Sequence, residues 1–167
     1  MRARIRGVTM VELVIYMLIV AILASAAFLS FTPGPISARY QAERLRTDLR
    51  HMQMLALTWG QRLRVTTASG NYFVTCVGSA TGVCATSASA CGSAITDPAT
   101  GNAFCVTLES GLALSPVATT FDVDSLGRPV SAAGALLSAD TAFNVAASGQ
   151  TYTLTVRPIT GFASVSP

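Results

Sequence analysis

Glu12 is the residue with the clearest chemical demand near the start of the chain, because it lies at the edge of a long apolar stretch. Nineteen residues without a charge follow it, from Leu13 to Phe31. A carboxylate at the edge of such a stretch is costly unless it is paired or close to water, and ionisable residues in this setting usually have a function. Since none of the nineteen residues is basic, a partner for Glu12 must come from elsewhere.

A new amino terminus would supply that partner. If the chain is cut after Gly7, the amine of Val8 becomes a positive charge four residues before Glu12, on the same side of a helix. The two charges can pair within one chain, or between staggered chains, through a charge-assisted hydrogen bond. Pairing between chains would hide both charges inside an assembled bundle of helices.

The apolar stretch predicts a helix that crosses a membrane. Of the 167 residues 51% are apolar and only 11% are charged. From Val8 to Phe31 a helix would be about 36 Å long, enough to span a bilayer. Arg2, Arg4 and Arg6 precede it and, by the positive-inside rule, favour a cytoplasmic amino terminus. The remaining residues hold eight arginines and eight acidic residues, so the net charge of +3 belongs to the N-terminal segment.

A secretory signal peptide is the alternative interpretation of this segment. The basic start, the apolar stretch and an A-x-A pattern at 24–26 are typical of one. However, the apolar stretch is longer than the usual roughly 7–15 residues, and a signal peptide gains nothing from a carboxylate at Glu12.

Residues 7–13, GVTMVEL, resemble the processing site of type IV prepilins and type II secretion pseudopilins. The match includes Gly7, Thr9 and Glu12, whereas Val8 replaces the more usual Phe or Met. This resemblance implies that residues 1–7 are a leader removed by a prepilin peptidase, and that Val8 is then N-methylated.

The same resemblance implies where the protein works. Residues 8–35 would form a transmembrane and assembly helix in the bacterial inner membrane, with residues 36–167 as a periplasmic pilin-like head. Other pilin or pseudopilin subunits are the expected partners, through the N-terminal helix. The subunit would then leave the membrane for a periplasmic pseudopilus or a cell-surface pilus.

An amphipathic helix is predicted at 37–60, after a break at 31–35 that contains two prolines. Ser37 is the expected N-cap, and Gly60 is a natural stop. An apolar stripe at spacings of three and four residues marks one face. Its members are Ala38, Ala42, Leu45, Leu49, Met52, Ala56 and Trp59.

The rest of the chain, 61–167, is predicted to be rich in β-strands, with a hairpin turn at 68–70 and a further turn at 125–129. The expected strands are 62–67, 71–77, 104–108, 117–123, 142–147 and 151–156. A helix followed by strands predicts an α+β head in which antiparallel sheet covers the helix stripe. With the pilin resemblance, the expected shape is a lollipop: a long N-terminal helix packed on a β-rich head.

Two stretches resemble the GspH/FimT branch of the pilin superfamily. They are the passage from 45 to 65 and the segment FDVDSLGRP at 121–129. That branch contains minor pseudopilins of type II secretion, minor type IV pilins and minor pilins of mannose-sensitive haemagglutinin pili. It implies a minor filament subunit near the tip. No part of 78–103 shows the resemblance.

Four cysteines predict two disulfides. Their spacing contains no C-x-x-C pair and no histidine lies near them, so a zinc site is disfavoured, while exposure to the periplasm favours oxidation. We expect the nested pairs Cys76–Cys105 and Cys84–Cys91, because the first two fall on predicted strands and the second two share the loop 78–103. A redox or metal role is the alternative.

The sequence predicts no enzyme, cofactor or resident metal. His51, the only histidine, lies on an arginine-rich helix and is expected to face solvent or the filament. Asp122 and Asp124 precede a turn, where aspartate is common, which disfavours a calcium site. The chain has no lysine and therefore no Walker motif, which excludes an assembly motor.

The charge distribution suggests subunit contacts. Residues 39–64 hold six arginines against two acidic residues, whereas 65–167 hold two arginines against five. The basic helix of one subunit would then face the acidic surface of another. The alternative is a tip pilin that binds DNA or a surface during DNA uptake or adhesion, but the tail 161–167 carries no basic residue.

Overall fold

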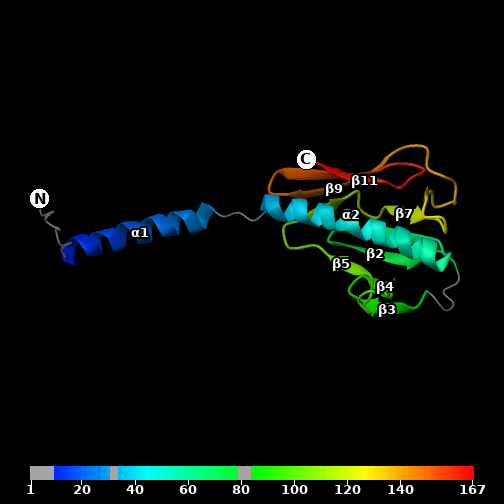
Figure 1. Cartoon of the computed structure of the whole chain (residues 1–167), viewed down its shortest axis with the longest axis horizontal. Helices are drawn as coiled ribbons and strands as arrows, with labels where there is room; N and C mark the ends of the chain where they lie inside the picture. Colours follow the sequence, from blue (N-terminus) through cyan, green and yellow to red (C-terminus); the bar gives the residue numbers. More distant parts are fainter. Residues whose placement is uncertain (1–9, 31–33, 79–83) are drawn as a thin grey trace, which may run out of the picture. The chain divides into compact units, whose positions relative to one another are not determined.

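A computed structural model of the chain describes residues 10–30, 34–78 and 84–167 (Figure 1). The chain divides into two compact units at Pro33. The predictions for Gly7 and Val8, and part of the predicted break at 31–35, lie outside the described residues.

The first unit is one helix, α1 (Met10–Ser30). Its described side chains, those of residues 10–25, are all exposed within the unit, and most of them are aliphatic. Ser25, one of its few polar residues, bonds back to its own helix through Oγ and the Ile22 carbonyl, 2.8 Å apart. Within the described part of the chain, no helix combines the length and the apolarity that crossing a membrane requires.

The second unit begins with α2 (Gly34–Trp59), whose apolar stripe is confirmed. All seven predicted members are buried except Trp59, which is partly buried, and Leu55 and Gln41 join the buried face. Ser37 as N-cap is wrong, because the helix starts three residues earlier and tolerates Pro35 in its first turn, where the missing N–H costs nothing. Gly60 ends the helix as predicted, with φ of 62° and a bond from the Gln61 N–H to the Ala56 carbonyl.

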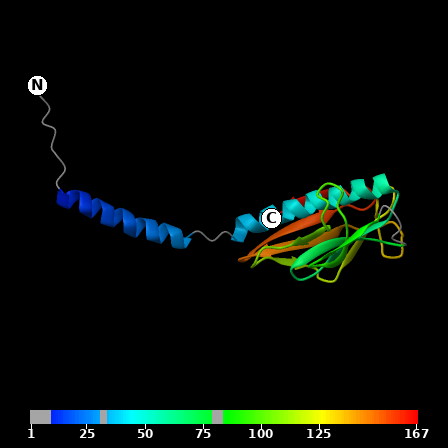
Figure 2. The ribbon, with the colours of Figure 1, turned by 90° about the horizontal axis from the view of Figure 1, so that it is seen from below.

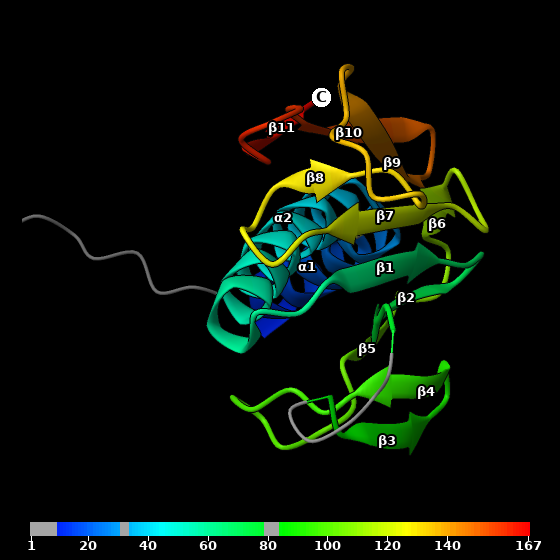
Figure 3. The ribbon, with the colours of Figure 1, turned by 90° about the vertical axis from the view of Figure 1, so that its right-hand side faces the viewer.

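Eleven strands are described after α2: β1 (Leu63–Thr67), β2 (Asn71–Cys76), β3 (Thr86–Ser89), β4 (Gly92–Ile95), β5 (Cys105–Thr107), β6 (Ala113–Ser115), β7 (Thr120–Val123), β8 (Pro129–Val130), β9 (Thr141–Ala147), β10 (Gln150–Val156) and β11 (Ala163–Ser166). They form sheets in the orders β5-β2-β1-β7-β8, β11-β10-β9-β6 and β3-β4, and every pair is antiparallel. Seen end-on, the five-stranded sheet lies between the four-stranded sheet and the β3–β4 hairpin (Figure 3). The α+β prediction is confirmed.

Short turns determine the register of the two main hairpins. The predicted turn at 68–70 joins β1 to β2 and places Thr67 opposite Tyr72. Ser148 and Gly149 join β9 to β10, both with positive φ, as a two-residue hairpin turn requires. The turn between β9 and β10 leaves Leu154 and Val156 on the buried face of β10.

Both larger sheets share one core under α2, which lies along one side of the strands (Figure 2). Leu45 from α2, Val65 from β1 and Leu154 from β10 are all nearly inaccessible to solvent. Between the sheets, the rings of Phe121 and Phe143 meet edge to face, with centroids 6.0 Å apart. The head therefore has a hydrophobic core of its own, built entirely from residues of the second unit.

The loop predicted at 78–103 is wrong, because β3 and β4 form a hairpin within it. This segment consists largely of Ala, Ser, Gly and Thr, so it lacks the β-branched and aromatic pattern that indicates strands. Ile95 nevertheless anchors the hairpin in the main core. The short strands β6, β8 and β11 were also not predicted.

The nested disulfide pairing is also wrong. The bonds are Cys76–Cys84 and Cys91–Cys105, with Cα–Cα distances of 6.2 and 5.9 Å. Cys84 precedes β3 and Cys91 lies at the hairpin turn, so the hairpin separates the two by most of its length. A disulfide requires Cα atoms within about 7 Å, which this separation prevents. All four cysteines are oxidised, as predicted.

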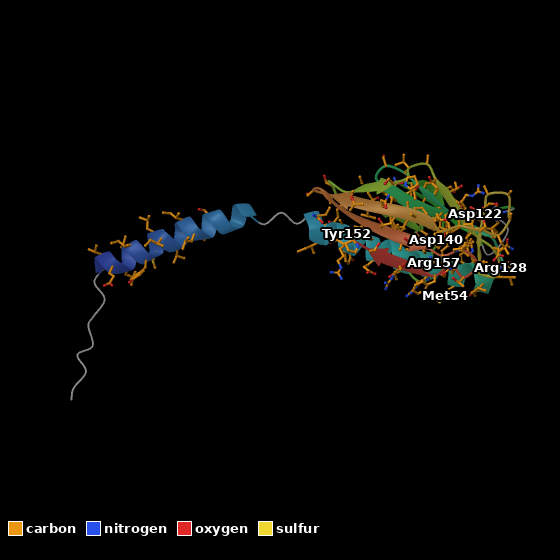
Figure 4. All side chains as sticks on the ribbon, turned by 90° about the horizontal axis from the view of Figure 1, so that it is seen from above. Met54, Asp122, Arg128, Asp140, Tyr152 and Arg157 are labelled. Carbon is orange, nitrogen blue, oxygen red and sulfur yellow. A yellow bond between two sulfur atoms is a disulfide. The ribbon has the colours of Figure 1, made fainter. Side chains whose placement is uncertain are left out.

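The contribution of the buried face of α2 to the stability of the head can be tested directly. We expect Leu45→Ala to lower the free energy of unfolding of residues 34–167 by about 2–5 kcal/mol, because it opens a cavity under both sheets. Met54→Ala is the matched control: Met54 is 63% exposed on the outer side of α2 (Figure 4), and its loss should cost about 0.5 kcal/mol or less. Urea denaturation followed by circular dichroism measures both, and equal losses would contradict this arrangement.

Candidate functional site

Glu12 lies in the first turn of α1, where a carboxylate is favoured by the positive end of the helix dipole. It is exposed within its unit, and the Tyr16 hydroxyl donates to its Oε1 at 3.5 Å. Around it lie exposed aliphatic side chains such as Val11 and Leu13. This helix surface can therefore offer one negative charge within an apolar face to another molecule.

Asp122 is the centre of a buried charge cluster in the head. Its side chain is completely buried on β7, directly opposite Arg64 of β1. The Arg64 guanidinium binds both carboxylate oxygens of Asp122. Its Nε donates to Oδ1 at 2.7 Å and its Nη2 donates to Oδ2 at 2.9 Å. These bonds raise the pKa of Arg64. Arg62 also pairs with Asp122, so two cations hold one carboxylate.

The second role of Arg62 is to fix the chain after β8. Its Nη2 donates to the Ser131 carbonyl at 2.6 Å and to the Ala132 carbonyl at 2.8 Å. Asp122 is thus committed to joining β1, β7 and the loop after β8.

Asp124 closes the predicted turn between β7 and β8. Its side chain accepts from the N–H groups of Leu126 and Arg128, at 2.9 and 2.8 Å, and from the Arg128 guanidinium. Burial alone would raise the pKa of Asp124, but these bonds hold it below its ordinary value. Figure 4 shows Asp122 and Arg128 at the end of the head where α2 finishes. The FDVDSLGRP segment is therefore a structural motif here.

His51 does not face solvent freely, which corrects the solvent-facing alternative of the prediction, while the filament-facing alternative stays a prediction. Its Nε2 lies 2.9 Å from Oδ1 of Asp97, and its side chain is 28% exposed. The ring also packs 5.7 Å from that of Phe104, centroid to centroid. No local pattern predicts this contact, since Asp97 is 46 residues away in the segment predicted to be a loop.

Asp48 and Tyr72 form a second link between α2 and the sheet. The Tyr72 hydroxyl donates to Asp48 Oδ2 at 2.5 Å. Burial and the neighbouring Asp48 charge raise the pKa of Tyr72, and burial raises that of Asp48. These groups bind α2 to β2, and among the described residues no cluster of three or more His, Cys, Asp or Glu could hold a metal.

Three of the six arginines at 39–64 form ion pairs within the head. Arg62 and Arg64 bind Asp122, and Arg46 pairs with Glu43 at 3.2 Å. The remaining three, Arg39, Arg44 and Arg50, are exposed along α2. Arg50 lies 5.8 Å from the ring of Phe162.

Comparison with known proteins gives two findings. Residues 2–28 match the family described as the prokaryotic N-terminal methylation motif. The structure is similar to that of the minor pseudopilin EpsH from the type 2 secretion system of Vibrio cholerae, with a TM-score of 0.51 and 15% identity, over 78% of this chain and 96% of that chain. Comparison with the sequences of curated proteins finds no match.

These findings give the chain a prokaryotic N-terminal methylation motif and, after the helix, an antiparallel β-rich head with a pilin-like fold. The particular likeness is to a minor pseudopilin, and at this level of identity it establishes the fold. The pilin-like resemblance predicted from the sequence is confirmed.

The Asp122 cluster yields a stability prediction. Asp122→Asn should lower the free energy of unfolding of the head by about 3–5 kcal/mol, because it leaves two arginines next to a buried site without their charge partner. Asp140→Asn removes the same charge from an exposed pair with Arg157, 2.8 Å apart (Figure 4), and should cost about 1 kcal/mol or less. Chemical denaturation of both variants gives the comparison, and a similar small loss in each would refute the role of Asp122.

The His51–Asp97 contact yields a pH prediction. Burial alone would raise the pKa of Asp97, but bonds from His51 and the Ala99 N–H hold it below its ordinary value of 3.8. The ionised carboxylate therefore stabilises the fold above that value, and this contribution is lost as the pH falls through the lowered pKa. We expect Asp97→Asn to cost about 1.5–3 kcal/mol near neutral pH, and progressively less as the pH falls below 3.8 toward the lowered pKa of Asp97.

Asp48→Asn is the control for this pH effect. Burial raises the pKa of Asp48, so its ionisation opposes folding. The asparagine keeps an oxygen that can accept the Tyr72 hydrogen bond, and the cost of this replacement should not grow as the pH rises from the acid range. Unfolding curves recorded across the acid range test both variants. A cost for Asp97→Asn that does not change with pH would show that its charge is irrelevant.

Proposed function

We propose that this chain is a minor pilin or pseudopilin subunit, cleaved after Gly7 by a prepilin peptidase and N-methylated on Val8. Residues 8–35 anchor it once in the bacterial inner membrane, with the amino terminus in the cytoplasm. It is then assembled near the tip of a type II secretion pseudopilus or a type IV pilus. The methylation motif at 2–28, followed by a pilin-like head, carries this proposal.

The exposure of α1 supports assembly through this helix. An apolar helix with every described side chain exposed must be covered by lipid or by other helices. Lipid covers α1 before assembly, and the helices of neighbouring subunits cover it afterwards. The head does not need α1 for its own core, so α1 is available for both surroundings.

Glu12 provides the specific contact within that apolar helix bundle. After cleavage, the methylated amine of Val8 still carries a positive charge. In the filament, the Glu12 carboxylate of one subunit binds the amine of its neighbour, which removes both charges from contact with lipid. The pair also determines the axial register of the two helices, because each chain has one such carboxylate and one such amine.

The intact mass and N-terminal sequence of the mature protein from its native host test the proposal. We expect a chain that starts at N-methyl-Val8, because the leader ends at Gly7 and the new amine is the methylation site. A start near Ala27 would mean that the apolar helix is removed as a signal peptide, and the proposal would fail.

Glu12→Gln separates assembly from processing. This variant should still be cleaved after Gly7, and its head should remain folded, but its recovery in sheared filaments should fall about tenfold or more through loss of the ion pair. Glu109→Gln, which removes an exposed glutamate from the head, is the matched control and should leave incorporation unchanged. Normal incorporation of Glu12→Gln would refute the role of Glu12.

A further inference from the structure

The head has an open groove of about 420 Å³ beside the first two turns of α2, lined by Ile36, Arg39, Tyr40, Glu43 and Tyr152, here called the α2 groove. Ile36 and Tyr40 are 74% and 61% exposed. Tyr152 comes from β10 and lies at the end of the head where α2 begins (Figure 4). Solvent-exposed apolar and aromatic side chains gathered at one place indicate an interaction surface.

The α2 groove continues over the four-stranded sheet. A second hollow of about 220 Å³ shares Arg39, Glu43 and Tyr152 and extends to Val165 and Ser166 of β11 and to Pro167. In the combined surface, aliphatic and tyrosine side chains lie beside the guanidinium of Arg39. Tyrosine and arginine beside aliphatic groups are the residues that proteins place at the boundary between lipid and water.

The basic side chain that lines the α2 groove is that of Arg39. It is exposed, while Glu43, the acidic residue of the lining, is paired with Arg46 at 3.2 Å. The first turn of α2 holds no acidic residue, and the positive end of the helix dipole adds to the potential of Arg39. The whole head has eight arginines and seven acidic residues, so this potential is local and not a property of the molecule as a whole.

The short link between α1 and α2 limits how far the α2 groove can lie from the end of α1. Only three residues separate the end of α1 at Ser30 from the start of α2 at Gly34. At about 3.6 Å per residue, that link spans roughly 15 Å at most, whatever the orientation of the two helices. If α1 is the membrane anchor, Ile36, Arg39 and Tyr40 are therefore held close to the outer surface of the same membrane.

We propose that the α2 groove binds the headgroups of anionic phospholipids in the membrane that holds α1, before the subunit enters a filament. Arg39, with the start of α2, binds lipid phosphate, and Ile36, Tyr40 and Tyr152 insert at the level of the headgroups. This inference rests on the proposed membrane anchoring. It assigns to the head a second contact with lipid, which must be released when the subunit is extracted.

Vesicle flotation tests this contact on the head alone, residues 34–167, with the amino terminus blocked so that no extra amine lies beside the α2 groove. The head is suitable because its core is complete without α1. Vesicles of phosphatidylglycerol mixed with phosphatidylcholine are compared with vesicles of phosphatidylcholine alone, at low and high salt. We expect binding to the anionic vesicles only, and weaker binding as salt is raised.

Variants locate the contact. Arg39→Gln should weaken binding to anionic vesicles about fivefold, the typical contribution of one basic residue at such a surface. Tyr40→Ser should weaken it as well. Arg50→Gln is the matched control, because it removes an exposed arginine from the other half of the same helix and should bind like the unchanged head. Equal losses for Arg39→Gln and Arg50→Gln would overturn the assignment to the α2 groove.

Two further outcomes would overturn the proposal. One is absence of flotation, or equal flotation with uncharged vesicles. The other is thermal stabilisation by inorganic phosphate that depends on Arg39 without any vesicle binding, which would show a site for a free anion. The N-terminal sequence of the mature protein is read separately, so failure of the anchoring proposal and failure of this inference give different results.

Discussion

The burial of one face of α2 is the constraint on which the rest of the head depends. Both larger sheets place buried apolar side chains in the core beneath this helix, where the sheets also meet each other through Phe121 and Phe143. Each fully buried aliphatic or aromatic side chain contributes about 1.5–3 kcal/mol, so a stripe of this length dominates the stability of a domain of this size. The strands after α2 are short, and they remain ordered because their inner faces have this helix to pack on.

The buried carboxylate of Asp122 adds direction to that packing. Apolar contacts alone tolerate sliding of one strand past another, whereas a carboxylate bound by Arg64 through two bonds permits only one register between β1 and β7. Arg62 extends the same constraint to the loop after β8. Asp122, Arg62 and Arg64 are charged residues of types that often bind ligands, but here they bind one another and stabilise the fold.

The elements that the sequence predicts well are those whose signal is local. The stripe of α2 repeats over about six turns, and the β1–β2 and β9–β10 hairpins alternate cleanly. The β3–β4 hairpin was missed because its small side chains carry no periodic signal, and its order comes from Ile95 and the disulfides. The pairing of His51 with Asp97, and that of the cysteines, depends on which strands become neighbours, and no spacing in the chain encodes that. The proposed processing and assembly site is different, because Gly7, Val8 and Glu12 are predicted from the local motif alone.

The disulfide order has a consequence for how the protein matures. The cysteines are bonded in their order along the chain, first to second and third to fourth. For a chain exported as proposed here, Cys84 emerges next after Cys76, and Cys105 next after Cys91. An oxidant that joins each newly exposed thiol to the one waiting before it produces the native bonds directly. The nested arrangement would instead have required a wrong bond to be opened and exchanged, so this head can mature with an oxidase and has no need of an isomerase.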